Sequence, residues 1–427
     1  MQKEKTLKEI IEKIEKKEAI ILTANELCEK IKLGETYAID DIDVVTTATR
    51  GIMSGTYAVL SFEVAPPDTF IRASKVWLNG VKGQIGPCPN ERIGILDIIV
   101  NGTEHSKYNH NYGGGHLFRD LVDGKLIKIE FETIEGFHFK KDIYLKDMPH
   151  AKLFATRHAF KNYLAFTNPS KELKHTIFHT AEFKGNLKEA TISGCGEINP
   201  IENDPNLETI GVGTKVLING AEGFVIGTGT RSSSKKPNLS GFANMHNMNP
   251  EYMGGFITSN GPEIINSWAI PIPVLNTKIL ENLIKLDGKI PLTVVDVNNR
   301  LPLCSTNYGD AWNGTDFAIK YNENVCINCE ICLIEKICPM NAININGVKK
   351  IHELCFNCGY CISKCEYGAF SGNLGNIHYD DGVIKKEIPI TLRQSDRMRA
   401  IQLSEELKNK IISKKFLMTE FVNKLIP

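Results

Sequence analysis

Eight of the twelve cysteines in this 427-residue chain lie in two short runs whose spacing suits iron–sulfur chemistry. The first run reads Cys-x-x-Cys-x-x-Cys-x5-Cys-Pro, and the second reads Cys-x-x-Cys-x-x-Cys-x3-Cys. Three thiolates spaced by two residues can ligate one cuboidal cluster, and the fourth Cys of each run ligates the cluster of the other run. The pattern therefore predicts two [4Fe-4S] clusters, each of which moves one electron. The expected ligands are Cys326, Cys329, Cys332 and Cys365 for one cluster, and Cys355, Cys358, Cys361 and Cys338 for the other.

Disulfide bonds and zinc are the alternative uses of so many cysteines. Disulfides are disfavoured because the first residues are charged and polar and lack the apolar region of a signal peptide, so we expect a cytoplasmic protein with reduced thiols. Zinc sites are usually built from two pairs of ligands, and two triplets each followed by a single Cys fit that pattern poorly. Two departures from the usual cluster motif are visible, since five residues precede Cys338 and Glu366 follows Cys365 where Pro is usual.

Four further cysteines lie outside the two runs, and two of them are candidates for catalysis. Cys88, in Gly-Pro-Cys-Pro-Asn, and Cys195, in Ser-Gly-Cys-Gly-Glu, occur in irregular turns marked by Gly and Pro. Such turns can expose a thiolate, so either residue could act as a nucleophile or carry sulfur, with a structural role as the alternative. Cys28 and Cys304 follow apolar patterns and are expected to be structural.

Several loops carry groups that could bind an anionic substrate. Arg50 and Arg231 lie in loops of small residues, from which a guanidinium could bind an oxyanion, with ordinary surface salt bridges as the alternative. A glycine run precedes a predicted helix, whose first backbone amides can bind an anion, and His116 beside it is a candidate acid or base. The run lacks the residues of a phosphate loop or a dinucleotide motif. Its members are Gly113, Gly114 and Gly115.

These residues belong to a chain that is too long to be a cluster-binding module alone. Lys plus Arg and Asp plus Glu are equal at 50 each, so the chain lacks the basic excess of nucleic-acid-binding proteins. No apolar run approaches the roughly 20 residues needed to span a bilayer. We therefore expect neither nucleic acid nor a membrane as a partner.

Short apolar runs separated by Gly, Pro and Asn dominate the middle of the chain and predict a strand-rich α/β or α+β large domain. Residues 1 to about 33 have helical apolar spacing, with a second short helix expected from Asn25 to Lys32 that ends at Gly34. Further helices are expected near 115–122 and 276–286. The cysteine runs predict a small bacterial-ferredoxin-like domain with two [4Fe-4S] clusters, followed by a C-terminal helix. The expected domains are residues 1–315, 316–375 and 376–427.

Three segments carry a resemblance to a known family: Asp43–Gly55, Tyr112–His116 and Ser193–Pro200. Over roughly residues 10–315 the chain resembles the archaeal homocysteine-biosynthesis family, in which members similar to L-aspartate semialdehyde sulfurtransferase convert an aldehyde to a thiol. With the cysteine runs fused behind, the chain is most similar to the methanogenesis-marker metalloprotein branch. That branch is linked to the last step of coenzyme M synthesis, in which sulfoacetaldehyde becomes 2-mercaptoethanesulfonate.

One position departs from the pattern of the family. Members of the homocysteine type carry a cysteine directly after Gly-x-Met, where this chain has Ser54 after Met53. A hydroxyl cannot carry a persulfide, so the resemblance implies either direct use of sulfide or a sulfur-carrying role for Cys88 or Cys195. Ser54 remains a candidate catalytic residue.

The resemblance implies a reaction that uses both parts of the chain. Sulfide addition to an aldehyde and loss of water give a thioaldehyde, which needs two electrons and two protons to become a thiol. Ferredoxin-type clusters near about −400 mV could supply the electrons. The implied partners are a small aldehyde, a sulfide or persulfide donor and a low-potential electron donor. Sulfoacetaldehyde is the first expected substrate and aspartate semialdehyde the alternative, and a non-catalytic electron-transfer or cluster-delivery subunit is the alternative to an enzyme.

Overall fold

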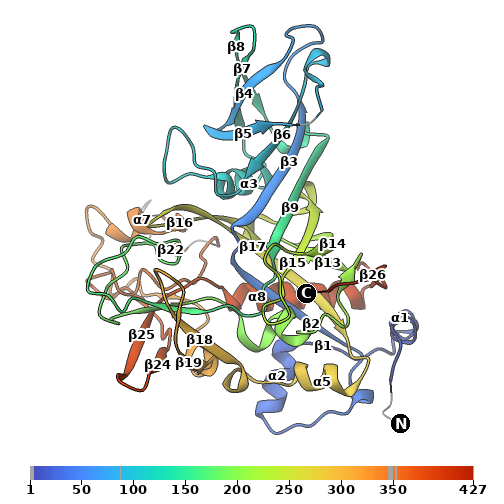
Figure 1. Cartoon of the computed structure of the whole chain (residues 1–427), viewed down its shortest axis with the longest axis vertical. Coiled ribbons are helices and arrows are strands. Elements are labelled where there is room, and N and C mark those ends of the chain that lie inside the picture. The colour runs from blue at the N-terminus through green and yellow to red at the C-terminus, as the bar shows by residue number, and fades with distance from the viewer. Residues whose placement is uncertain (1–3, 87, 345–349, 352, 427) are drawn as a thin grey trace.

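The computed structural model describes residues 4–86, 88–344, 350–351 and 353–426. Its dominant element is a 14-stranded sheet that extends through most of the height of the molecule (Figure 1). Neighbouring strands are antiparallel, except that β1 and β2 are parallel. In sheet order the strands are β1 (Ile21–Thr23), β2 (Val44–Ile52), β17 (Gly261–Pro273), β13 (Lys215–Ile218), β14 (Ala221–Thr228), β15 (Leu239–Asn244), β9 (His150–His158), β3 (Gly55–Glu63), β6 (Ile95–Asn101), β5 (Val81–Ile85), β4 (Ala73–Leu78), β7 (Ile127–Thr133) and β8 (His138–Ile143), with β16 (Gly254–Thr258) paired to β17.

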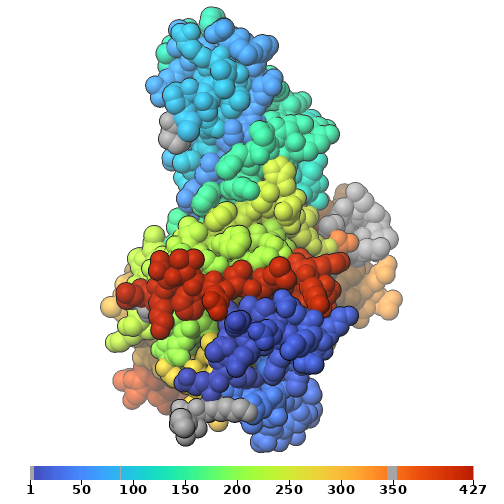
Figure 2. All heavy atoms as spheres, turned by 90° about the vertical axis from the view of Figure 1, so that its right-hand side faces the viewer, coloured from blue at the N-terminus to red at the C-terminus, as the bar shows by residue number. Residues whose placement is uncertain are grey.

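The strand-rich large domain predicted from the sequence is confirmed. Apolar runs that begin near residues 44, 57, 127, 215 and 223 lie in β2, β3, β7, β13 and β14. Strand β3 alternates buried and more exposed side chains, as expected for a strand with one face on a core. Strands β4 to β8 form a lobe that projects from the rest of the molecule (Figures 1 and 2).

A second sheet of six strands collects segments that are distant in the sequence. Its middle pairs are mixed, because β10 is antiparallel to β11 but parallel to β18, and β11 is parallel to β25. In sheet order its strands are β19 (Pro302–Asn307), β18 (Pro291–Asp296), β10 (Ala165–Thr167), β11 (Ala190–Ile192), β25 (Lys385–Arg393) and β24 (Asn376–Asp380).

Strands β24 and β25 occupy a segment that the sequence analysis assigned to a helical tail. In β25, Ile388, Ile390 and Leu392 alternate with more exposed residues, which is the period of a strand. The helix begins only at Arg397, as α8 (Arg397–Ile412), with Asp396 as its N-cap. The tail was therefore predicted correctly for α8 and wrongly for the residues before it.

The helices cover the sheets and also bear out most of the predicted positions. The first 33 residues hold two capped helices with β1 between them, and the second helix confirms the short helix predicted over residues 25–32. Helix α8 packs on β2 and β17 of the large sheet, and the C-terminal segment (red) lies beside the N-terminal segment (blue) on the face in Figure 2. The other helices are α1 (Leu7–Lys16), α2 (Ala24–Lys32), α3 (Gly114–Val122), α4 (Pro200–Asn203), α5 (Thr277–Leu283), α6 (Gly309–Trp312) and α7 (Leu333–Ile337).

The cysteine-rich segment contains only short elements and lies beside the second sheet (Figure 1). It is tied to the large sheet through a backbone hydrogen bond of 3.0 Å from Ile257, in β16, to Pro339. The short strands are β20 (Lys320–Tyr321) paired with β23 (Phe370–Ser371), β21 (Ile343–Asn344) paired with β22 (Lys350–Ile351), and, outside this segment, β12 (Gly211–Val212) paired with β26 (Asn423–Lys424).

Among the described residues, no helix is long and apolar enough to cross a membrane.

Candidate functional site

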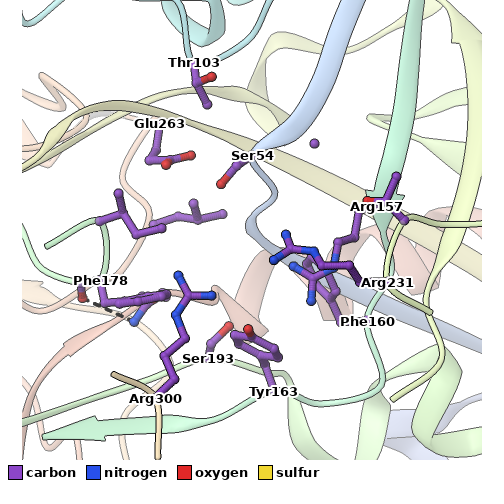
Figure 3. A pocket seen from close by; sticks show the side chains of 15 residues that line it. Ser54, Thr103, Arg157, Phe160, Tyr163, Phe178, Ser193, Arg231, Glu263 and Arg300 are labelled. Carbon is purple, nitrogen blue, oxygen red and sulfur yellow. Dashed lines mark hydrogen bonds between the residues drawn. The ribbon is translucent and has the colours of Figure 1, made fainter. Parts of the chain in front are cut away.

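A cavity of about 320 Å³ lies where the two sheets meet (Figure 3). The large sheet contributes the turn between β2 and β3, the end of β9 and the start of β17, and the second sheet contributes the loops that follow β11 and β18. Small-molecule sites are commonly found at such junctions because several chain segments end there. We refer to this space as the substrate cavity.

Three arginines converge on the substrate cavity, and their guanidinium groups face it in Figure 3. Arg157 lies one residue before the end of β9, Arg231 follows β14, and Arg300 follows β18. Within the described residues, none of the three is within ion-pair distance of a carboxylate, so their positive charge is not neutralised by the chain. Arginine guanidinium groups bind carboxylate, sulfonate and phosphate oxygens in a planar fork. The cavity is therefore suited to a small anion.

Aromatic rings lie against two of these arginines, and two of the three have an unusual backbone conformation. The Arg157 guanidinium lies 4.7 Å from the centre of the Phe160 ring, and that of Arg300 lies 5.0 Å from the Phe178 ring. Both aromatic residues line the same cavity. Arg231 and Arg300 also have left-handed φ angles of 60° and 62°, which are unfavourable for residues with a Cβ and are typical of functional loops.

Glu263 provides the one carboxyl group among the described residues that line this cavity, and it faces Ser54 in Figure 3. It lies near the start of β17 and is buried. Burial raises the pKa of Glu263, although hydrogen bonding with the Ser54 hydroxyl opposes part of the shift. One of its oxygens, Oε2, has no hydrogen-bond partner among the described residues. Glu263 is therefore a candidate general acid, with Ser54 beside it.

A buried hydrogen-bond network fixes the turn that carries Ser54. Trp268 Nε1 donates to His158 Nδ1 at 2.9 Å, so the other ring nitrogen of His158 carries the proton and donates to Thr56 Oγ1 at 2.7 Å. The Thr56 hydroxyl in turn donates to the Met53 carbonyl at 2.6 Å. Burial lowers the pKa of His158 to about 3, which keeps the ring neutral. The network connects the sheet core to the residue directly before Ser54.

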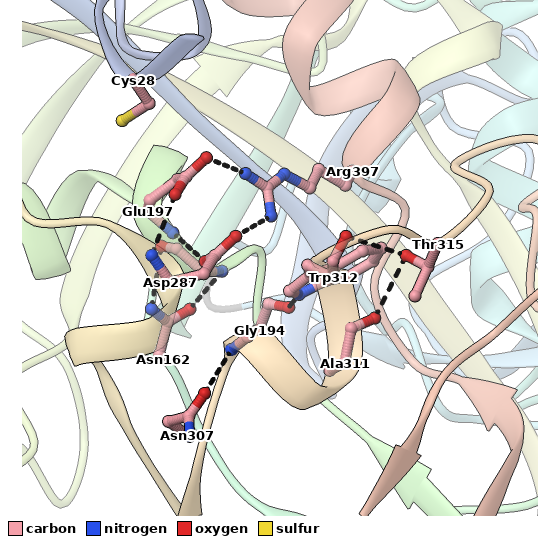
Figure 4. Close-up of polar contacts among 12 residues, drawn as sticks. Cys28, Asn162, Gly194, Glu197, Asp287, Asn307, Ala311, Trp312, Thr315 and Arg397 are labelled. Carbon is pink, nitrogen blue, oxygen red and sulfur yellow. Dashed lines mark hydrogen bonds and ion pairs between the residues drawn. The ribbon is translucent and has the colours of Figure 1, made fainter. Parts of the chain in front are cut away.

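The loop that carries Cys195 is held by buried charges, as Figure 4 shows. Arg397, at the start of α8, pairs with Glu197 at 2.7 Å and with Asp287 at 2.5 Å. Lys32 adds a second cation at 2.8 Å from Glu197. Two cations thus balance two carboxylates, which offsets the cost of their burial. The arrangement positions the loop so that Ser193 reaches the substrate cavity.

Cys195 itself does not line the substrate cavity. Its side chain is fully buried, and Sγ lies 3.6 Å from Thr49 Oγ1 and 3.7 Å from the Arg50 carbonyl. Burial raises the pKa of the Cys195 thiol, which disfavours the thiolate needed for nucleophilic chemistry. Cys88 is exposed in the loop after β5 and is likewise absent from the cavity lining. The two cysteines singled out from the sequence are therefore not brought together with Ser54 and Arg231.

Arg50, which we expected to bind substrate, has a structural position. Its side chain is completely buried, forms an ion pair with Asp396 and donates from Nη2 to the Glu251 carbonyl at 3.0 Å. Its guanidinium also lies 5.2 Å from the centre of the Phe356 ring. These contacts connect β2 to the start of α8 and to the cysteine-rich segment, and they leave Arg50 outside the cavity.

The glycine run and His116 also serve the fold. The amide of Gly113 donates to His116 Nδ1 at 3.1 Å, and those of Gly114 and Gly115 donate to backbone carbonyls at 2.8 Å. All three amides are thus engaged, and a Cβ on Gly114 would lie 2.1 Å from the Asn101 carbonyl oxygen. Burial lowers the pKa of His116 to about 4. Neither the glycines nor His116 line the substrate cavity.

The eight cysteines of the two runs gather around two separate cavities. One cavity of about 260 Å³ is lined by an outer cysteine set, and a tighter one of about 20 Å³ is lined by an inner cysteine set. The outer set is Cys326, Cys329, Cys332 and Cys365, and the inner set is Cys338, Cys355, Cys358 and Cys361. This grouping matches the crossed pairing expected from the spacing. Within the described part of the chain, no three His, Cys, Asp or Glu side chains are close enough to hold a single metal ion.

Backbone amides point at sulfur atoms of the inner set. Ala342 N lies 3.4 Å from Cys338 Sγ, and Asn357 N lies 3.4 Å from Cys355 Sγ. Such N–H···S contacts stabilise cluster thiolates and help to set cluster potentials. The donor set and its surroundings thus fit a [4Fe-4S] cluster.

Three functional candidates in the cavity were missed by the sequence analysis. Glu263 had a detectable signal, because it is a lone carboxyl in the otherwise largely apolar strand β17. Arg157 and Arg300 had no detectable signal in the sequence, because charged residues are common near strand ends. Only the fold brings these two arginines together.

Comparisons with known proteins place these observations in a family. A family model described as homocysteine biosynthesis enzyme, sulfur-incorporation, matches residues 19–418. An uncharacterized protein of Methanothermobacter thermautotrophicus is 42% identical over 411 residues, covering 96% of this chain and 94% of that protein. L-aspartate semialdehyde sulfurtransferase of Methanosarcina acetivorans is 31% identical over 303 residues, covering 69% of this chain and 59% of that protein. The enzyme of the same name from Methanocaldococcus jannaschii is also 31% identical, over 71% of this chain and 62% of that protein. No solved structure matches.

Proposed function

Because the chain belongs to the family of homocysteine biosynthesis enzymes that incorporate sulfur, we propose that it converts a small anionic aldehyde to a thiol. The observation that carries the proposal is the substrate cavity, which is lined by one buried carboxyl group and by three arginines that have no carboxylate partner among the described residues. A cation-lined cavity of about 320 Å³ matches a small acidic molecule. The balanced reaction is aldehyde plus hydrogen sulfide, two electrons and two protons, giving thiol plus water.

The inner and outer cysteine sets would hold two [4Fe-4S] clusters, which supply the electrons one at a time when bound. Support comes from the four-cysteine lining of each cavity and from the amides directed at Cys338 and Cys355. The small bacterial-ferredoxin-like domain is proposed on the same grounds.

In the proposed mechanism, the arginines bind the acid group of the aldehyde and orient its carbonyl toward Glu263. The pKa of Glu263 is raised by burial, which retains the proton that the departing oxygen needs. The Ser54 hydroxyl beside it is positioned to hydrogen-bond the same oxygen. Since neither Cys88 nor Cys195 lines the cavity, the arrangement supports direct attack by sulfide rather than by a persulfide on either residue.

Two aldehydes are candidates for the substrate. Aspartate semialdehyde, giving homocysteine, is supported by the names of the relatives that match two thirds or more of this chain. Its ammonium group needs an acceptor, however, and the raised pKa of Glu263 disfavours the charged carboxylate that would provide one. Sulfoacetaldehyde, giving 2-mercaptoethanesulfonate, has an anionic group and no ammonium, and the lining of three arginines favours it.

A side-by-side assay separates the candidates. Anaerobic, cluster-loaded protein is supplied with sulfide and a low-potential reductant, together with one of the two aldehydes, and the thiol is identified by mass spectrometry. The aldehyde with the higher kcat/KM is the substrate, and the Glu263→Gln variant serves as the matched control. Absence of thiol from both aldehydes would contradict the proposal and favour a non-catalytic electron-transfer subunit.

A further inference from the structure

The two cysteine cavities share a wall, and the inner one is connected to the substrate cavity by direct contacts between residues that line or adjoin the two. Ile334 lines both the outer and the inner cysteine cavities. The inner cavity adjoins the substrate cavity on its other side, as the next contacts show. Neither cysteine cavity has a lining residue in common with the substrate cavity among those described. The contacts that follow connect the inner set to the substrate cavity, and they place the inner set between the other two.

The strand β25 connects the inner set to the substrate cavity. Arg393 N donates to the carbonyl of Cys358, an inner-set cysteine, at 2.9 Å. The next residue, Gln394, lines the substrate cavity. Ile52 reinforces this wall, because it lines the substrate cavity and packs in the same hydrophobic cluster as Cys338 and Cys358.

A second set of contacts, through Tyr360 and His179, also connects the inner set to the substrate cavity. Tyr360, between two inner-set cysteines, meets the ring of His179 edge-on at 5.6 Å between ring centres. The residue before His179 is Phe178, which lines the substrate cavity and accepts a hydrogen bond of 3.2 Å from Gln394 Nε2 on its carbonyl. The inner set is thus joined to the cavity wall by two packed, hydrogen-bonded routes.

The outer set faces solvent instead. Exposed apolar side chains surround its cavity, with 49% to 65% of each side chain's surface accessible. They are Ile327, Ile331, Leu333 and Tyr367. Electrons from outside the protein reach this set more directly than the inner one.

From this order we propose that electrons enter at the outer cysteine set, pass to the inner set and leave through Gln394 and Ile52 to the substrate. The proposal rests on the proposed reductive function. The external donor is a low-potential one-electron carrier, and it must act twice for each thioaldehyde reduced. Each thioaldehyde takes two electrons and two protons to become a thiol. No side chain of the protein is oxidised or reduced in this step.

Paired ligand variants test the order by electron paramagnetic resonance of the reduced protein. C326S/C329S removes the outer site, and C355S/C358S removes the inner site. We expect a soluble gadolinium chelate to enhance relaxation of the signal that remains in C355S/C358S at least several-fold more than that in C326S/C329S. Equal enhancement in the two variants would overturn the proposal. This measurement needs no substrate, so its outcome is independent of the proposed reaction.

The direction of transfer is tested in a single turnover. Both variants are reduced, freed of reductant and mixed with sulfide and aldehyde, and the loss of the reduced signal is followed. We expect substrate-driven oxidation to be retained in C326S/C329S and lost in C355S/C358S. The reverse pattern, or equal rates, would refute the order. If sulfide and aldehyde do not oxidise the reduced wild-type protein at all, the proposed function is wrong. The gadolinium experiment still decides which cysteine set lies nearer to solvent.

Substitutions outside the cysteine sets test the route without the risk that loss of a cluster ligand unfolds the protein. Gln394→Ala keeps all eight cysteines and is expected to slow substrate-driven oxidation of the wild-type clusters about tenfold, while their reduction from outside is unchanged. Ile334→Ala, between the two cysteine sets, is expected to slow equilibration between them and to leave oxidation of the inner set intact. An unchanged rate in Gln394→Ala would contradict the route through the cavity wall.

Discussion

The cysteine sets and the substrate cavity are assembled in opposite ways. All eight cysteines come from one stretch of 40 residues, Cys326 to Cys365, and regular spacing brings most of them together. The cavity groups come from segments between Ile52 and Gln394, on both sheets. Ligands of a cluster are selected by local spacing, whereas groups that bind an organic anion are selected by the positions at which distant strands end.

The two regions also differ in charge. The inner and outer cysteine cavities are lined mainly by cysteine and aliphatic side chains, while the substrate cavity has three arginines and one carboxyl group. Apolar surroundings suit electron-transfer centres, and guanidinium groups without carboxylate partners suit a charged reactant. The comparison predicts that substitution of a cluster cysteine abolishes turnover. Substitution of a residue that lines the substrate cavity is expected to lower turnover or substrate affinity only in part.

The largest effect is expected for Cys361→Ser, in the inner set. Loss of one ligand should remove a cluster, lowering bound iron by about half and abolishing turnover. Iron analysis and the thiol assay measure both. Cys304→Ser, a cysteine outside both sets on β19, is the matched control and should keep full iron and activity. Wild-type turnover in Cys361→Ser would remove the distinction between the two regions.

A large but finite effect is expected for Glu263→Gln. Loss of a general acid typically costs about 10²- to 10⁴-fold in rate. Because burial raises the pKa of Glu263 and the protonated form is the active one, wild-type kcat should fall as pH rises through that raised pKa. The pH profile of kcat should become flat in the variant. A variant that keeps the wild-type pH dependence would exclude Glu263 as the acid.

Arg231→Gln is expected to weaken substrate binding with a smaller effect on kcat. A hydrogen bond to a charged group is worth about 1.5–3 kcal/mol, which corresponds to a rise in KM of about 10- to 100-fold. Arg231→Lys should recover part of the loss. Lys235→Gln removes a nearby cation that does not line the cavity and should leave KM unchanged. Equal effects of the two glutamine variants would indicate a general influence of surface charge.

The smallest effect on activity is expected for His158→Gln, which alters the network behind the Ser54 turn. The pKa of His158 is lowered from 6.5 to about 3 in the folded state. The unfolded chain therefore binds more protons between these values, and the stability provided by the neutral ring is lost as pH falls below about 6.5. The variant should lose this contribution, which amounts to at most about 1.4 kcal/mol per pH unit. Chemical denaturation at several pH values measures the slope, and an unchanged slope would contradict the assignment.

Several features of the fold were predictable from local patterns. The strand-rich domain, the helices near residues 115 and 277 and the grouping of eight cysteines all follow from periodicity or spacing. Strands β24 and β25 were missed because short alternating runs resemble loop and helix sequence until a partner strand is known. The Cys195 loop was recognised as unusual, yet its glycines serve a buried charge network and not an exposed thiolate.

By itself, the sequence determined the chemistry that the chain is equipped for: eight thiols at cluster spacing, a strand-rich scaffold and a resemblance to enzymes that insert sulfur. These properties depend on neighbours within a few residues, and so they survive without a fold. Only the tertiary structure decided that Arg50 and His116 are structural, and that Arg157, Arg231, Arg300 and Glu263 surround one cavity beside the inner cysteine set. Long-range strand pairing brings those side chains together, and no local pattern encodes it.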